Sequence, residues 1–187
     1  AVTGLRRTET KRLIFHMGPL EGIRVLDFTR VVAGPLATRI LADQGAEVIK
    51  VEPPEGDLSR TFPPLLENEI TPYFAQQNAG KLFCSFNLLH DETPQLVAEL
   101  AAQCDVIVEN FRPGVMAKFG LDYESLSKEN PRLVYCSITG FGQTGPWANR
   151  RAYAPIGHLE SGLIEYDQRK NDRPARQPSL VLGDSVT

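Results

Sequence analysis

Residues Gly22–Pro53 read GIRVLDFTRVVAGPLATRILADQGAEVIKVEP, and this stretch decides the fold. An apolar run over 23–28 predicts a strand that is buried on both faces, and a second run over 48–51 predicts another. Between these runs, apolar residues recur at helical spacing. They follow Pro35, which suits the first position of a helix, and they precede Gly45, which suits its end. The stretch is therefore one β-α-β unit, and its two strands should lie parallel.

The rest of the chain continues this alternation. Further elements are predicted as strands over 82–88, 106–108 and 133–138 and as helices over 73–78, 93–101, 115–119, 123–129 and 154–162. Polar segments that contain proline, over 53–72 and 167–178, predict surface loops. Strands that alternate with helices at this spacing predict an α/β fold with a doubly wound, mostly parallel, Rossmann-like sheet.

Composition limits the partners. The chain has 187 residues, enough to bury one sizeable core, and a formal net charge of −3. This charge argues against a nucleic-acid or membrane-surface partner, and it means that any phosphate must be bound by local groups. Cys84, Cys104 and Cys136 lie too far apart for a zinc pattern, and their odd number argues against a disulfide framework. We therefore expect no metal site and a reducing, cytoplasmic compartment.

Residues 1–17 differ from the rest of the chain. The first sixteen hold four basic residues against one acidic residue and show no helical or strand periodicity. We expect a leader or a disordered extension and exclude it from the fold. If residues 1–16 were a transit segment, a mitochondrial or other organelle matrix would replace the cytoplasm, but the serines typical of such segments are missing.

In an open parallel sheet, ligands bind at the carboxyl ends of the strands. The loops expected there are Thr29–Gly34, Glu109–Gly114 and Thr139–Gly145. The first loop has one glycine where the dinucleotide-binding fingerprint needs three, and no G-K-[ST] sequence follows a strand. Despite the fold, the sequences of these loops therefore argue against a nicotinamide or flavin dehydrogenase and against a P-loop protein.

Four blocks, in this order, carry a family resemblance. They are LEGIRVLDFTRVVAGPLATRILADQGAEVIKVEPPEGD (20–57), VIVENFRPGVMAKFGLDYESL (106–126), YCSITGFGQTGP (135–146) and LGDS (182–185). Together they resemble the family III CoA-transferases, which include formyl-CoA and carnitine-type transferases and the α-methylacyl-CoA racemases. The resemblance covers nearly all of the chain from about Gly18 onward. No single block is unusual, but their order makes the match specific.

The resemblance implies a CoA-transferase, which moves coenzyme A from an acyl-CoA donor to a small carboxylic acid acceptor. Asp184 matches the family's catalytic aspartate, which forms covalent intermediates. Taken alone, Gly183–Ser185 would predict a turn or a helix cap. The residues that match CoA-contacting positions of the family are Arg30, Val31, Val32, Ala33, Asn110, Phe111, Lys118, Arg151 and Tyr153. Without the resemblance, the three basic residues in this set (Arg30, Lys118 and Arg151) would predict only solvated surface.

Several residues depart from the family pattern, and these departures indicate which members of the family the chain resembles least. Val32 and Pro53 replace a glutamine and an arginine of the formyl-CoA members, which argues against an oxalate or formyl enzyme specifically. Ala154 stands where many transferases have an acidic residue. The racemases use a His-Asp pair in a G-H-D-x-N-Y block, whereas this chain reads YAPIGHLESG from Tyr153. We interpret His158 as a structural histidine. A transferase is favoured, and a racemase or epimerase and a non-catalytic acyl-CoA-binding fragment stay open as alternatives.

Family members are much longer than this chain. The resemblance implies that they carry a second, smaller domain and form interlocked homodimers. We therefore interpret residues 18–187 as the N-terminal part of the large domain, with the second domain absent, and expect a homodimer only at full length. The fragment alone should be inactive, because Asp184 would lack the covering loop that excludes water.

Overall fold

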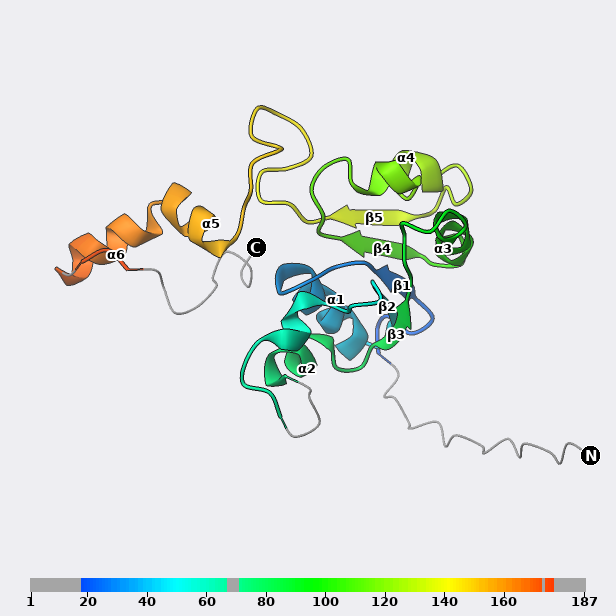
Figure 1. Ribbon diagram of the computed structural model, residues 1–187, viewed down its shortest axis with the longest axis horizontal. Helices are drawn as coiled ribbons and strands as arrows, with labels where there is room; N and C mark the ends of the chain where they lie inside the picture. Colours follow the sequence, from blue (N-terminus) through cyan, green and yellow to red (C-terminus); the bar gives the residue numbers. More distant parts are fainter. Residues whose placement is uncertain (1–17, 67–70, 173, 177–187) are drawn as a thin grey trace, which may run out of the picture.

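A computed structural model describes residues 18–66, 71–172 and 174–176 of the chain (Figure 1). Its centre is a five-stranded sheet in the order β3-β2-β1-β4-β5, and every pair of neighbouring strands is parallel. The strands are β1 (Arg24–Asp27), β2 (Glu47–Glu52), β3 (Leu82–Ser85), β4 (Val106–Glu109) and β5 (Val134–Ser137). The chain starts in the middle and winds outward to both edges, so the predicted doubly wound fold is confirmed.

The helices lie between the strands and after the last one. They are α1 (Ala33–Asp43), α2 (Pro72–Asn78), α3 (Thr93–Ala101), α4 (Tyr123–Leu126), α5 (Ala154–Glu160) and α6 (Leu163–Asn171), with 3-10 turns η1 (Leu58–Thr61) and η2 (Met116–Phe119). Among the described residues, none of these helices is both long enough and apolar enough to cross a membrane.

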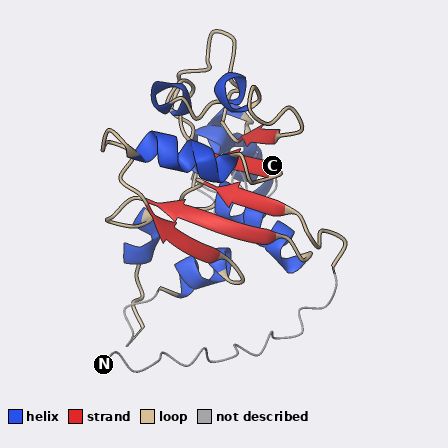
Figure 2. Cartoon of the chain, turned by 90° about the vertical axis from the view of Figure 1, so that its right-hand side faces the viewer, coloured by secondary structure: helices blue, strands red, loops and turns tan. Residues whose placement is uncertain are grey.

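The two faces of the sheet are covered by different helices, as Figure 2 shows. Alternation along the strands directs Val25 and Val48 to one face, where they pack with residues of α1. Leu26 and Ile107 point to the other face, where they form the larger core cluster with Val97 of α3. Strands that are buried on both faces explain why the sequence shows continuous apolar runs rather than alternation.

The prediction of a loop over 167–178 is wrong for its first residues, because α6 continues to Asn171. None of the residues of α6 is buried, so its polar sequence resembles that of a loop. Pairs four residues apart support it: Arg169 donates to Glu165 over 2.5 Å, and the Asn171 amide donates to the Asp167 carboxylate over 2.8 Å. Such pairs can stabilise a helix that is polar on all sides.

A buried charged pair ties β1 to the elements around it. The fully buried Asp27 carboxylate accepts bonds from the N–H of Thr29 (2.8 Å), from the hydroxyls of Thr29 (2.5 Å) and Thr38 (2.7 Å), and from the Lys81 ammonium (2.9 Å). Lys81 also donates to the carbonyl of Pro35 over 3.0 Å. One carboxylate therefore joins the end of β1, the first turns of α1 and the residue before β3.

Substitution of Lys81 by methionine tests how much this pair contributes. We predict that Lys81→Met lowers the free energy of unfolding of the intact protein by about 3–5 kcal/mol, because Asp27 would remain buried without a counter-charge. Chemical denaturation measures the change. The control is Arg169→Met, which breaks an exposed ion pair and should cost less than about 1 kcal/mol. Equal losses in the two variants would contradict the role given to Lys81.

Candidate functional site

The loops after β1 and β4 meet at the carboxyl edge of the sheet. The side chain of Asn110 pairs with the backbone of Arg30 in both directions: its Oδ1 accepts the Arg30 N–H, and its Nδ2 donates to the Arg30 carbonyl, each over 2.8 Å. The Arg30 guanidinium lies 5.0 Å from the centre of the Phe111 ring, within cation–π distance. The two loops are therefore fixed to each other at one point.

A cavity of about 240 Å³ opens beside this junction. Its lining comes from residues at or just after the ends of β1, β2, β3 and β4 and from η2, and it is mostly apolar, with Arg30, Glu52, Glu55 and Asn87 as its polar members. The lining residues are Phe28, Arg30, Val51, Glu52, Pro53, Glu55, Phe86, Asn87, Leu88, Leu89, Phe111, Val115, Met116 and Phe119. The volume lies just below that of typical ligand pockets, so the cavity suits one end of a larger ligand.

The amino end of α1 opens onto the same loop. Val32 is its N-cap residue, no side chain caps it, and its first turn holds no acidic residue. Gly34 is needed here, because a Cβ at this position would lie 2.2 Å from Cγ2 of Thr29. Free N–H groups and the helix dipole favour a negative charge at such an end.

The loop after β1 has an unusual backbone. Val31 has φ of 70°, a left-handed conformation that β-branched residues rarely adopt. Its N–H donates to the Asp57 carboxylate, with distances of 3.3 and 3.2 Å to the two oxygens. Burial alone would raise the pKa of Asp57, but bonds from Ser59 and the charge of Lys50 outweigh it and hold this pKa below its ordinary value. Asp57 therefore keeps its charge.

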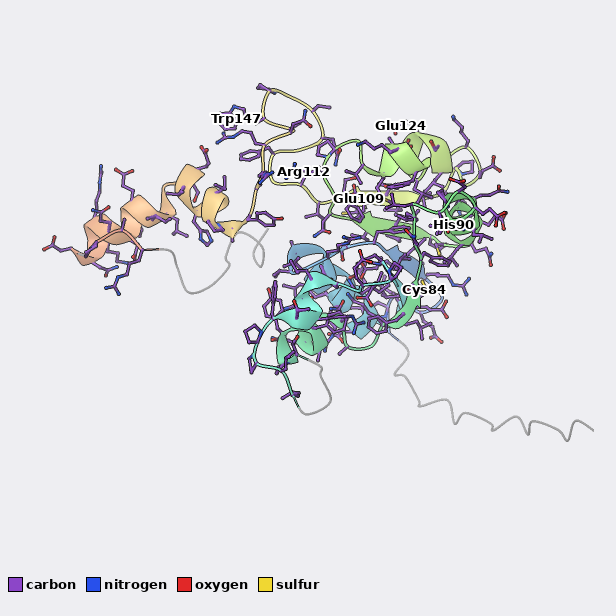
Figure 3. All side chains as sticks on the ribbon, viewed as in Figure 1. Cys84, His90, Glu109, Arg112, Glu124 and Trp147 are labelled. Carbon is purple, nitrogen blue, oxygen red and sulfur yellow. The ribbon has the colours of Figure 1, made fainter. Side chains whose placement is uncertain are left out.

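Glu109 ends β4 directly before Asn110 and is labelled in Figure 3. Its side chain is buried, and its carboxylate accepts the N–H of Phe111 over 2.8 Å. Burial raises the pKa of Glu109 above its ordinary value, although bonds from Ser137 and from the Phe111 N–H favour the charged form. Glu109 thus supports the loop that carries Asn110 and Phe111.

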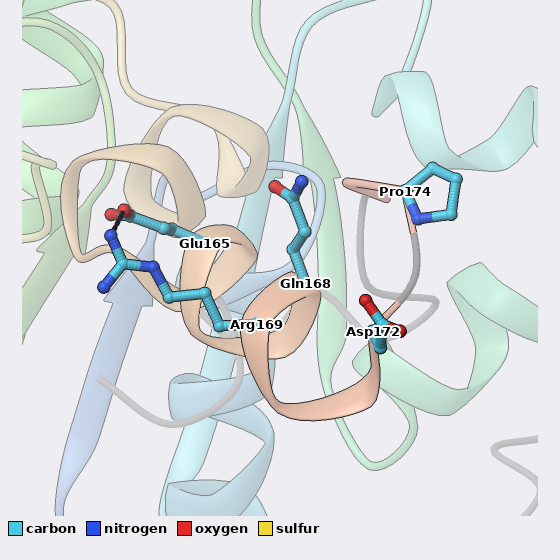
Figure 4. A pocket seen from close by; sticks show the side chains of 5 residues that line it. All are labelled: Glu165, Gln168, Arg169, Asp172 and Pro174. Atoms are coloured by element: carbon cyan, nitrogen blue, oxygen red, sulfur yellow. Dashed lines mark hydrogen bonds and ion pairs between the residues drawn. The ribbon is translucent and has the colours of Figure 1, made fainter.

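A second hollow, of about 550 Å³, runs along α6 (Figure 4). It is lined by Glu165, Gln168, Arg169, Asp172 and Pro174, which all lie on α6 or directly after it. A ligand there would meet a single element, whereas the smaller cavity gathers the ends of four strands. We therefore place the candidate site at the smaller cavity. No group of three or more His, Cys, Asp or Glu side chains arranged to hold a metal occurs among the described residues.

Comparison with known proteins identifies the family. Residues 20–187 match the model of CoA-transferase family III. The chain belongs to CoA-transferase family III. It is 45% identical over 172 residues to succinyl-CoA:glutarate CoA-transferase of Mus musculus and 42% identical over 168 residues to acetyl-CoA:oxalate CoA-transferase of Acetobacter aceti. These matches cover 91% and 89% of this chain but only 39% and 43% of the two relatives.

Solved structures agree with this assignment. A crystal structure of a CAIB/BAIF family protein from Brucella suis superposes with a TM-score of 0.81 at 40% identity, and the match covers 89% of this chain and 45% of that protein. The family resemblance read from the four sequence blocks is confirmed. The match to the N-terminal part of longer family III proteins is confirmed as well.

The structure places the predicted site residues of this family III chain in three groups. Six lie on the two meeting loops or at the first position of α1: Arg30, Val31, Val32, Ala33, Asn110 and Phe111. Lys118 is exposed on η2, which contributes other residues to the cavity, but Lys118 does not line it. Arg151 and Tyr153 precede α5 in the sequence, and both are exposed. Neither of them lines the cavity. Asp184 lies outside the described residues.

Sequence reasoning missed the side chains that support the loops, namely Lys50, Asp57 and Glu109. A signal existed for Lys50, because a lysine in the run VIKV of a strand that is buried on both faces needs a partner. Asp57 precedes a serine by two residues, a pattern typical of a turn or cap, and nothing in that pattern indicates a bond to Val31. The bond exists because the loop after β2 folds back over the loop after β1.

Replacement of Glu109 tests its electrostatic environment. The raised pKa means that the fold favours the protonated acid, so the contribution of Glu109 to stability is largest below pH 4.5 and declines as the pH rises through the raised value. Glu109→Gln cannot titrate. We therefore predict that the wild-type protein loses stability relative to Glu109→Gln as the pH rises from 4.5, in urea denaturation at a series of pH values. A stability difference between the two proteins that stays constant with pH, or that changes in favour of the wild type as the pH rises, would contradict a buried Glu109 with a raised pKa.

Proposed function

We propose that the complete protein transfers CoA from an acyl-CoA to a small carboxylic acid, through covalent intermediates on Asp184. The observation that carries the proposal is the junction of Arg30 and Asn110 beside an apolar cavity, at the carboxyl edge of a family III sheet. The two relatives described above are named for transfer from succinyl-CoA to glutarate and from acetyl-CoA to oxalate. Their names support dicarboxylic acids as the first acceptors to test.

The chemistry needs one carboxylate and no net proton transfer. The Asp184 carboxylate attacks the thioester carbonyl, the C–S bond breaks, and a mixed anhydride and CoA thiolate form. The thiolate then attacks the Asp184 carbonyl, which gives an aspartyl-CoA thioester and releases the donor acid. The acceptor carboxylate reverses both steps, so CoA leaves on the acceptor and Asp184 is restored. This covalent route divides one exchange into easier steps.

In this proposal, residues of the described sheet hold the CoA. Arg30 and the uncapped end of α1 attract a phosphate locally, although the chain carries a net charge of −3. The Phe111 ring and the apolar lining suit the adenine ring or the aliphatic arm of CoA. Lys118 and Arg151 are proposed to neutralise further phosphates, and Tyr153, with an exposed fraction of 69%, to lie near the thioester. No metal is required.

The remainder of the complete protein completes the site. Residues 18–187 would form the N-terminal part of its large domain, and later sequence would supply the second domain and the loop that covers Asp184. We infer that the complete protein is a homodimer and acts in the cytoplasm. The isolated chain should not turn over, because water would reach the anhydride before an acceptor acid does.

Replacement of Asp184 tests the proposed intermediate. We predict that Asp184→Asn in the complete protein lowers kcat by about 10³-fold or more, because an amide cannot form the anhydride. Wild-type protein incubated with acyl-CoA and hydroxylamine should carry a hydroxamate at Asp184, detected by mass spectrometry of its peptides. Asp172→Asn changes an exposed carboxylate outside the candidate site and should leave kcat unchanged.

Other outcomes of the same experiment favour other functions. Solvent deuterium at Cα of the recovered acyl-CoA, without a hydroxamate, would support an epimerase. CoA binding without either product would support a non-catalytic acyl-CoA-binding protein. Full transfer activity in Asp184→Asn would contradict the proposed mechanism.

A further inference from the structure

A buried carboxylate supports the loop that we propose binds an anion. Asp57 lies between β2 and η1, has an exposed fraction of 1%, and does not line the cavity. A negative charge under a phosphate-binding loop would weaken binding unless it is neutralised. The Lys50 ammonium, also buried, lies 3.2 Å from Asp57 Oδ2 and provides this neutralisation.

Among the described residues, each group recorded as bonding to the Asp57 carboxylate is a donor. Oδ1 accepts the N–H of Ser59 over 2.9 Å and its hydroxyl over 2.8 Å, while both oxygens face the Val31 N–H and Oδ2 faces Lys50. A carboxylate, which only accepts, fits this environment. An asparagine would direct an NH2 group at one of these donors, so residue 57 is specific for an acid.

Three side chains from distant parts of the sequence hold three consecutive residues of the loop. Lys50 donates to the Thr29 carbonyl over 2.6 Å, Asn110 pairs with both backbone groups of Arg30, and Asp57 accepts the Val31 N–H. The last contact is made at the residue with φ of 70°. A valine leaves this conformation unless surrounding groups hold it.

We propose that Asp57 is a positioning residue for CoA: it holds Val31 in its left-handed conformation and so presents Arg30 and the amino end of α1 to the ligand. This inference rests on the proposed function. Asp57 acts through the Val31 N–H and does not contact CoA. Lys50 completes the arrangement, because it cancels the charge of Asp57 and binds the same loop at Thr29.

The test is the affinity of the complete protein for CoA, measured by calorimetry. Asp57→Asn should raise the Kd for CoA about tenfold, since it weakens the contact that fixes the loop at Val31, although the unpaired charge of Lys50 would by itself favour an anion. It should also raise the KM for acyl-CoA, while the KM for the acceptor acid, measured at saturating acyl-CoA, changes by less than about twofold. A rise in the KM for acyl-CoA alone indicates a positioning role, because a general loss of structure would raise the KM for the acceptor acid as well.

Asp122 offers a matched control. It too caps a short helix and accepts bonds from the N–H and the hydroxyl of one serine, Ser125, over 3.1 and 2.9 Å, but it lies at α4 and does not line the cavity. Asp122→Asn should leave the Kd for CoA unchanged. A similar rise in both variants would mean that any lost Asp cap weakens binding, and would overturn the proposal.

A second variant keeps the proposal testable if Asp57→Asn does not fold. Ser59→Ala removes one donor to Asp57 and keeps the ion pair, so it should raise the Kd about two- to threefold. An unchanged Kd in whichever of the two variants folds, even with a lower melting temperature, overturns the role of Asp57 and leaves the proposed function intact. If the wild-type protein binds no CoA, the proposed function itself fails.

Discussion

The candidate site depends on two charged pairs that are buried beneath one loop. Asp27 with Lys81 fixes the start of α1, and Lys50 with Asp57 fixes the residues between β1 and α1. Buried charges are costly to desolvate, so they persist where several hydrogen bonds satisfy them and where the removal of one partner would leave the other unpaired. Asp27, Lys50 and Asp57 are each bonded to Thr29 or Val31 of the loop, while Lys81 is bonded to Asp27 and to the Pro35 carbonyl of α1. The loop therefore has little freedom to take another conformation.

Rigidity of this kind suits the proposed chemistry. A carboxylate is a weak nucleophile, so the rate of CoA transfer must come mostly from the positions of the thioester and its activating groups. In the proposed mechanism the apolar cavity and the junction of Arg30 with Asn110 would hold one part of CoA, while Asp184 would act at the thioester. In this mechanism the described sheet would bind CoA, and its buried charges would hold backbone groups in place rather than transfer protons.

The sequence predicts the parts of this structure that depend on local pattern. Two apolar runs with a helix-spaced apolar pattern between them predict β1, α1 and β2. Similar apolar runs predict the remaining strands of the parallel sheet. Pattern fails where contacts join distant segments: the bond from Val31 to Asp57 depends on how two loops cross. It fails also for α6, whose polar residues show no buried face and whose helix is supported by pairs such as Glu165 with Arg169. Five of the nine residues expected to contact CoA lie on the meeting loops and a sixth, Ala33, begins α1. Arg151 and Tyr153 lie on a segment whose place relative to the cavity cannot be derived from sequence periodicity.

A crystal structure of the complete protein with bound CoA would test the central claim most directly. Our account predicts that a phosphate of CoA lies within hydrogen-bond distance of Arg30 or of the first N–H groups of α1, with an apolar part of the ligand in the cavity beside Phe111. Val31 should keep its left-handed backbone in that complex. CoA bound elsewhere, with the loops after β1 and β4 free of contact, would contradict the account.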